Sequence, residues 1–142
     1  MTTTDLVDRL AAHKTLAAAP REELAWLAAR GSVRDMVRGD ILTAKGVHPK
    51  GMFVVLEGRI AIFVDRGTGL HKVTEWNAGD VTGVLPYSRV VSSPGDSVAQ
   101  EASEILAVPR ADLAEMILEC HQVTSILVHS MLDRARVFTS SS

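Results

Sequence analysis

Gly39-Asp40-Ile41-Leu42, followed by Phe53-Val54-Val55-Leu56-Glu57-Gly58-Arg59-Ile60, is the stretch of sequence that decides the fold of this chain. Both segments join apolar, β-branched runs to a turn that contains glycine, which is the pattern of short strands meeting at tight corners. Gly79-Asp80-Val81-Thr82-Gly83 repeats the glycine–aspartate turn further along. Glycine at such corners allows positive φ angles or close backbone approach. The spacing therefore predicts a β-roll or sandwich through the middle of the chain.

The two ends of the chain have helical periodicity instead. Thr4 is expected to cap a first helix, Pro20 to lie in the first turn of a second, and Gly31 to end that helix in a left-handed conformation. After the sheet, apolar spacing predicts a short helix over 111–119 and a longer one over 121–138. We therefore divide the chain into three parts: an N-terminal helical segment (1–31), a β-roll (32–109) and C-terminal helices (110–142).

Length and composition predict a single globular domain. The chain has 142 residues, of which 46% are apolar and 23% charged, and its net charge of -2 provides no basic field for nucleic acid. No apolar run reaches the ~18 residues needed to span a bilayer, and the N-terminus does not read as a secretory signal. Cys120 is the single cysteine, expected to be a small buried hydrophobe. We expect a cytoplasmic protein that binds neither nucleic acid nor membranes.

Taken in order, these fragments resemble the cyclic nucleotide-binding domain, a regulatory module of bacterial transcription regulators, cyclic-nucleotide-dependent kinases and gated channels. The matching features are Gly39-Asp40, Gly46, Val55-x-x-Gly58-x-Ile60, Gly79-Asp80-x-x-Gly83 and Ser97-Val98. The resemblance implies a mainly β fold with flanking helices: an eight-stranded jelly-roll β-barrel (double-stranded β-helix) with N-terminal helices and two C-terminal helices. It also implies a regulatory sensor of the bacterial catabolite-regulator type rather than an enzyme.

The segment 83–96 occupies the place of the phosphate-binding cassette of that family. There, a glutamate after the cassette glycine binds the ribose, and a later arginine and the N-terminus of a short helix hold the cyclic phosphate. Gly83 matches the glycine, but Val84 stands at the glutamate position and Gly95 at the arginine position. Each missing charged hydrogen bond is worth ~1.5–3 kcal/mol. We therefore expect ligand binding to be lost or altered.

Arg89 offers a substitute for the missing arginine. If a short helix starts near Leu85 with Pro86 in its first turn, Arg89 closes that turn and can hold an anion; otherwise it is solvated or pairs with Asp96. The candidate ligand-binding residues are Gly83, Val84, Leu85, Tyr87, Ser88, Arg89 and Ser97. The candidate ligands are cyclic AMP, cyclic GMP or another small anion, and no cofactor is firmly indicated.

The alternative is a cupin-like jelly-roll enzyme or small-molecule binder. Cupin metal sites need clustered histidines and a carboxylate that face into the barrel. The roll here offers only His71 in a strand and His48 in a turn, and neither has a second histidine two to five residues away. No spacing suggests a nucleophilic triad or a phosphate loop. We therefore expect no metal site and no enzymatic activity.

The last predicted helix is apolar over roughly two-thirds of its circumference, more than packing on one surface needs. One apolar stripe can face the roll, and a second contains Val128, Leu132 and Ala135. We expect these three residues to form a homodimer or signalling surface that leads to a kinase or other output domain, although two-sided burial within a monomer also fits the pattern. The Leu-Pro-Tyr-Ser-Arg run at 85–89 looks like that in N-terminal input domains of some bacterial sensor histidine kinases.

Overall fold

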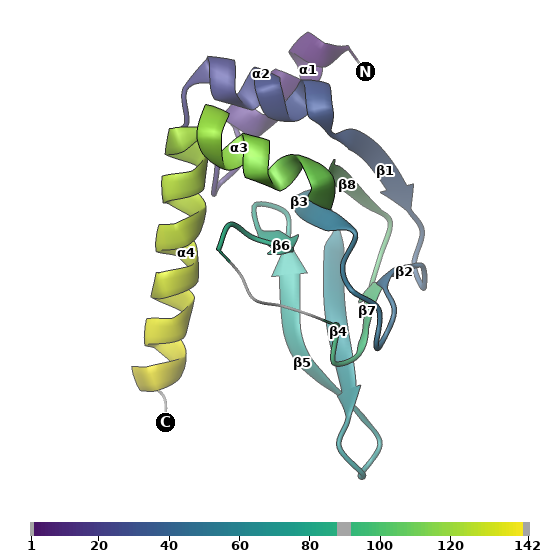
Figure 1. Ribbon diagram of the computed structural model, residues 1–142. Helices are drawn as coiled ribbons and strands as arrows, with labels where there is room; N and C mark the ends of the chain where they lie inside the picture. Colours follow the sequence, from purple (N-terminus) through teal and green to yellow (C-terminus); the bar gives the residue numbers. More distant parts are fainter. Residues whose placement is uncertain (1, 88–91, 141–142) are drawn as a thin grey trace.

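The computed structural model describes the backbone of residues 2–87 and 92–140 and the side chains as far as Arg134. Within these residues, eight strands form two antiparallel four-stranded sheets, and helices cover one of them (Figure 1). The strands are β1 (Ser32–Met36), β2 (Ile41–Thr43), β3 (Gly51–Glu57), β4 (Arg59–Asp65), β5 (Leu70–Asn77), β6 (Val81–Gly83), β7 (Asp96–Ala99) and β8 (Ser103–Pro109). The helices are α1 (Thr3–Ala11), α2 (Arg21–Arg30), a 3₁₀ turn η1 (Arg110–Asp112), α3 (Leu113–Glu119) and α4 (His121–Ser140).

The eight strands are as expected, but the closed barrel is not. One sheet has the strand order β1-β8-β3-β6 and the other β2-β7-β4-β5. Among the described residues no ladder joins the two, so each sheet keeps two edge strands and the arrangement is a sandwich of separate sheets. The edge strands β2 and β6 have only three residues each, too few to continue the hydrogen bonding around a barrel.

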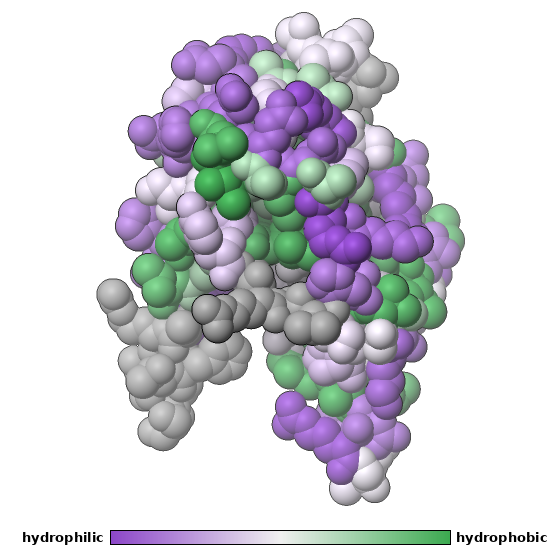
Figure 2. All heavy atoms as spheres, in the orientation of Figure 1, coloured by the Kyte–Doolittle hydropathy of each residue, from purple (hydrophilic) through white to green (hydrophobic). Residues whose placement is uncertain are grey.

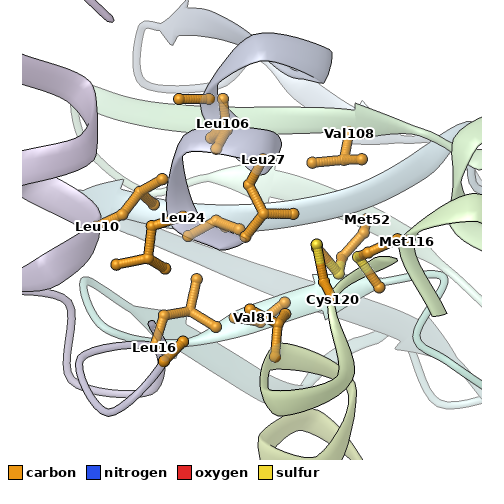
Figure 3. Close-up of a cluster of buried hydrophobic side chains, with 14 of the residues drawn as sticks. Leu10, Leu16, Leu24, Leu27, Met52, Val81, Leu106, Val108, Met116 and Cys120 are labelled. Atoms are coloured by element: carbon orange, nitrogen blue, oxygen red, sulfur yellow. The ribbon is translucent and has the colours of Figure 1, made fainter. Parts of the chain in front are cut away.

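Strand β3 is the centre of the fold because both of its faces are buried. Met52 and Val54 point to the helical layer, where they join a cluster of buried side chains from all four helices (Figure 3). Phe53 and Val55 point the other way, into a second cluster between the sheets. The near-continuous apolar run of this strand predicted this two-sided burial. The molecule is therefore built in three layers: helices, the sheet with β3, and the sheet with β4.

The N-terminal helices differ from the prediction at their ends. Thr2, not Thr4, caps α1, and it forms a reciprocal capping box with Asp5 (Asp5 N to Thr2 Oγ1, 3.1 Å). Pro20 is the N-cap of α2 rather than part of its first turn. Gly31 is extended (φ -86°), not left-handed. The reason for a glycine there is space, because a Cβ would lie 2.7 Å from Leu106 Cδ1.

Two contacts hold the C-terminal helices to α2. Arg30 makes a two-pronged ion pair with Glu115 of α3 (2.6 and 2.7 Å) and lies 4.9 Å from the centroid of the Trp26 ring. Glu23 caps the start of α4, where its carboxylate accepts hydrogen bonds from the backbone N–H groups of Gln122 (3.3 Å) and Val123 (2.8 Å). None of the helices described is long and apolar enough to cross a membrane.

Candidate ligand-binding site

A small cavity opens between the two sheets, where β2, β6 and β7 approach each other. Its volume is about 180 Å³. The lining residues come from both sheets and from the loops that join them: Leu42, Thr43, Pro49, Phe53, Ile62, Trp76, Thr82, Gly83, Ser93, Pro94 and Ser97. Every strand of the sheet β2-β7-β4-β5 contributes a side chain to the lining. The cavity therefore forms only when all of these strands are paired.

The walls of this cavity are apolar apart from four hydroxyl groups. Thr43 and Ser97 face each other across the β2–β7 ladder and are 8% and 7% exposed. Within the described part of the chain, neither hydroxyl makes a hydrogen bond to protein, whereas the Ser93 hydroxyl donates to the Gly95 carbonyl at 2.6 Å. None of the described residues that line the cavity carries a charge. The described part of the lining therefore offers no positive charge to a phosphate.

Of the five candidate site residues that the structure describes, it brings two together. Gly83 and Ser97 line the cavity. Val84 and Leu85 instead pack against the cluster of buried side chains between the helices and the sheet with β3. The side chain of Tyr87 is 73% exposed. Ser88 and Arg89 lie outside the described residues, so the predicted anion contact of Arg89 stays a prediction.

The predicted cassette helix does not run through its first residues. Pro86 and Tyr87 form a turn, and Tyr87 has a φ of 63°, the left-handed region that interrupts a right-handed helix. Proline at 86 fits a turn as well as a helix start, so the sequence signal was ambiguous. The helix N-terminus that would have bound an anion is absent from residues 83–87.

Two glycines of the cassette are explained by the fold rather than by a ligand. Gly83 has a φ of +84°, and a Cβ there would collide with the Gly51 carbonyl and lie 2.7 Å from Phe53 Cδ2. Gly95 is buried, and a Cβ there would collide with the carbonyl of Phe63. Position 95, where the family has its phosphate-binding arginine, therefore has no room for any side chain. This packing supports the reading that the arginine contact is missing at residue 95.

A second, larger hollow lies between α4 and the roll. It measures about 750 Å³ and is lined partly by Lys14, Asp80, Ile126, His129 and Arg134. Arg134 reaches across it to Asp80 at 3.6 Å. Figure 2 shows hydrophilic residues predominating over the helices at the top of the molecule. The hollow is bordered by both signs of charge and so does not resemble a selective anion site.

Sequence reasoning missed most of the cavity wall. Phe53 and Trp76 were identified as strand residues but not as lining, although their inward positions follow from strand alternation. Thr43 and Thr82 carried no signal of their own. No group of three or more His, Cys, Asp or Glu side chains that could hold a metal is found among the described residues. Cys120 is fully buried, as expected, and burial, with Glu23 and Glu119 nearby, raises the pKa of its thiol to about 11.

A sequence model of a known domain family identifies the family of this chain. The sequence model of the cyclic nucleotide-binding domain matches residues 33–120, which include all eight strands except the first residue of β1. The chain belongs to the cyclic nucleotide-binding domain family. Among curated proteins, no significant relative is found.

Solved structures agree with this family in fold. The catabolite activator protein of Thermus thermophilus superposes with a TM-score of 0.77 at 19% identity, over 90% of this chain and 61% of that one. The regulatory domain of Toxoplasma gondii protein kinase A, solved with cAMP, gives 0.75 at 16% identity, over 92% and 50%. The regulatory subunit of a cAMP-independent protein kinase A from Trypanosoma cruzi, bound to guanosine, gives 0.69 at 21% identity, over 81% and 43%.

These three neighbours are longer than the part that matches. The chain spans between 43% and 61% of their lengths. Identities near 20% establish the shared fold and not a shared ligand.

Proposed function

We propose that this cyclic nucleotide-binding domain is a non-catalytic regulatory module in which cyclic AMP and cyclic GMP bind weakly or not at all. The observation that carries the proposal is the cavity between the sheets, which is small and has no charged side chain among its described lining residues. Two of the structural neighbours were solved with cAMP and with guanosine, so the fold accommodates both charged and uncharged ligands. The lining of this cavity, rather than the fold, therefore decides what binds here.

The size of the expected loss is considerable. A cyclic phosphate needs a charged donor to replace its hydration, and each such hydrogen bond contributes ~1.5–3 kcal/mol. Val84 and Gly95 supply neither of the two expected contacts, so the combined loss is roughly 3–6 kcal/mol if the effects add. That is enough to turn a dissociation constant of ~1 μM into a millimolar one.

Calorimetric titration of the purified chain with cyclic AMP and cyclic GMP tests this proposal. We expect dissociation constants at or above about 1 mM for both. A constant near or below ~1 μM for either nucleotide would overturn the proposal. In that event Arg89→Ala decides the role of Arg89: a loss of ~1.5–3 kcal/mol would identify it as the phosphate contact, and an unchanged affinity would exclude it.

We further propose that α4 is the output element. It is 20 residues long, packs on the core through Val123 and Leu127, and leaves Leu132 57% exposed and Val128 half-buried. These residues would form a homodimer surface, and the helix would pass the state of the roll to a kinase or other output domain in the cytoplasm. Ala135 was predicted to belong to the same surface, but its side chain lies outside the described part of the chain. Rotation or sliding of packed helices between two states is an established way to transmit such a change.

A cupin-like enzyme has no support in the structure or in the matched family. The roll contains His71 on an exposed strand face, where its ring lies 2.9 Å from the hydroxyl of Thr68 and outside the cavity. No observation favours a second function.

A further inference from the structure

We propose that the cavity between the sheets binds an uncharged, single-ring aromatic molecule with one polar substituent. The proposal rests on the proposed function, in which this cavity does not take a cyclic phosphate, and it names the chemistry that replaces it. Three features of the lining point to this class of ligand: its aromatic walls, its pair of unpartnered hydroxyls and its volume.

The aromatic walls come from opposite sheets. Phe53 of β3 is 5% exposed and belongs to the core cluster between the sheets, and Trp76 of β5 is half-buried and packs against that cluster. Both residues line the cavity. Leu42 and Ile62 complete the apolar surface. An aromatic guest gains offset or edge-to-face contacts with such rings in addition to the burial of its area. An aliphatic guest of the same size would gain only the burial.

The two hydroxyls define one polar side of this apolar space. Thr43 and Ser97 are each more than nine-tenths buried, lie opposite each other in the β2–β7 register, and make no hydrogen bond to a described protein group. Neither hydroxyl is among the buried, unpartnered polar atoms of the described residues, so both reach the cavity and are available to a polar group of a ligand. Hydroxyls both donate and accept, and they can pair with a phenolic hydroxyl, an amide or a ring nitrogen.

The volume of the cavity matches about one ring for the part of a ligand that lies inside it. An engineered apolar cavity of about 150 Å³ in another protein stays dry and binds benzene, and the cavity here is about 180 Å³. A cyclic nucleotide, with a fused base, a ribose and a phosphate ring, is several times larger than benzene. A substituted single ring fills the space without displacing the strands.

Phenol and benzene are the probes, because they differ by one hydroxyl and fit the same space. Titration of the full chain by calorimetry should show saturable one-to-one binding of phenol, with a dissociation constant of about 1 mM or tighter, and competition between the two probes. The same ligands should raise the midpoint of thermal unfolding. Absence of saturable phenol binding up to about 10 mM would overturn the inference without any variant.

Two conservative variants then test the polar side. Thr43→Val and Ser97→Ala should each weaken phenol binding by about 3- to 10-fold and change benzene affinity by less than about 2-fold. Ser125→Ala, which removes an exposed hydroxyl on α4, is the matched control and should change neither. Equal effects on phenol and benzene, or no effect on either, would contradict the assigned role of the hydroxyls. Circular dichroism confirms that each variant is folded.

The outcome separates this inference from the proposed function. If cyclic AMP binds near ~1 μM, the proposed function fails. If neither cyclic nucleotide nor phenol binds, the proposed function stands and the inference alone is overturned.

Discussion

His13 is the residue whose environment most clearly couples ionisation to folding. It is 5% exposed in the loop after α1, its Nε2 lies 3.1 Å from the Val55 carbonyl, and its Nδ1 accepts a hydrogen bond from the Thr15 backbone N–H at 3.3 Å. Both contacts require the neutral ring with its proton on Nε2. Burial lowers the pKa of His13, an effect that the Val55 carbonyl and Asp80 oppose only in part.

We therefore predict that acidification destabilises the fold through His13. Because the folded pKa lies below the unfolded value of about 6.5, the unfolded chain takes up the proton first. The stabilisation is fully present above about pH 6.5 and is lost as pH falls below it, at about 1.4 kcal/mol for each pKa unit between the two states. Urea unfolding at several pH values between about 5 and 8 measures this.

His13→Gln should flatten that pH dependence while lowering stability near neutral pH. His129→Gln, at an exposed position on α4, is the matched control and should leave the profile as in the wild type. A wild-type profile no steeper than that of His13→Gln would show that His13 does not carry the effect.

At the same scale, the glycines show which backbone features can be predicted from the sequence and which cannot. The glycines at 39, 46, 58, 79 and 83 do have positive φ, as their corner positions predicted. Gly31 and Gly95 are glycines for another reason, since a neighbouring strand lies where a side chain would be. Such close approaches depend on residues far away in the chain, so no local pattern reveals them.

Among the elements, α4 depends on a cap that lies 100 residues away in the sequence. The carboxylate of Glu23, 9% exposed on α2, accepts hydrogen bonds from the first backbone N–H groups of α4, which have no partner within the helix. A carboxylate there also faces the positive end of the helix dipole. The sequence predicted both helices but not this contact, because capping patterns are recognised only between neighbouring residues.

We predict that Glu23→Ala lowers the free energy of unfolding by ~1–3 kcal/mol, because two N–H groups lose their acceptor in a largely buried place. Glu23→Gln keeps an acceptor oxygen and should cost less. Glu22→Ala removes the exposed neighbouring carboxylate and is the control, with an expected change within about 0.5 kcal/mol. Urea denaturation measures these values. Hydrogen exchange at 121–124 that is no faster in Glu23→Ala than in the wild type would mean that the cap does not hold α4.

On the scale of the whole molecule, the glycine-marked strands predicted a β-roll or sandwich and the family, and the resemblance to that family implied eight strands. Which strands pair within each of the two sheets was not predicted. Register and sheet membership depend on contacts such as β1 with β8 (Ser32 opposite Ala107), which join distant segments. The cavity depends on the same pairing, since its wall combines Leu42, Trp76 and Ser97 from three strands. The turn at Pro86 and Tyr87 was not predicted, and the loss of the ligand contacts of the cassette stays a prediction.

The unpartnered face of α4 leads to the prediction about assembly. Leu132 is 57% exposed beside the half-buried Val128, on a helix whose opposite face is already in the core through Leu127. Exposed apolar surface of this kind is usually covered by a partner, and two-fold pairing is the commonest closed arrangement. We therefore expect a symmetric homodimer with α4 near the two-fold axis, detectable by sedimentation at micromolar concentration.

The test of that dimer is a pair of matched substitutions. Leu132→Glu should weaken the dimer by at least about 10-fold, because it places a charge in the interface. Leu118→Glu changes an even more exposed leucine (70%) on α3 and should leave sedimentation unchanged. A clean wild-type monomer whose Leu132→Glu variant is equally stable and soluble would show that this face is neither buried nor paired. The paired-helix route from the roll to an output domain would then lose its physical basis, even if the cavity binds its ligand.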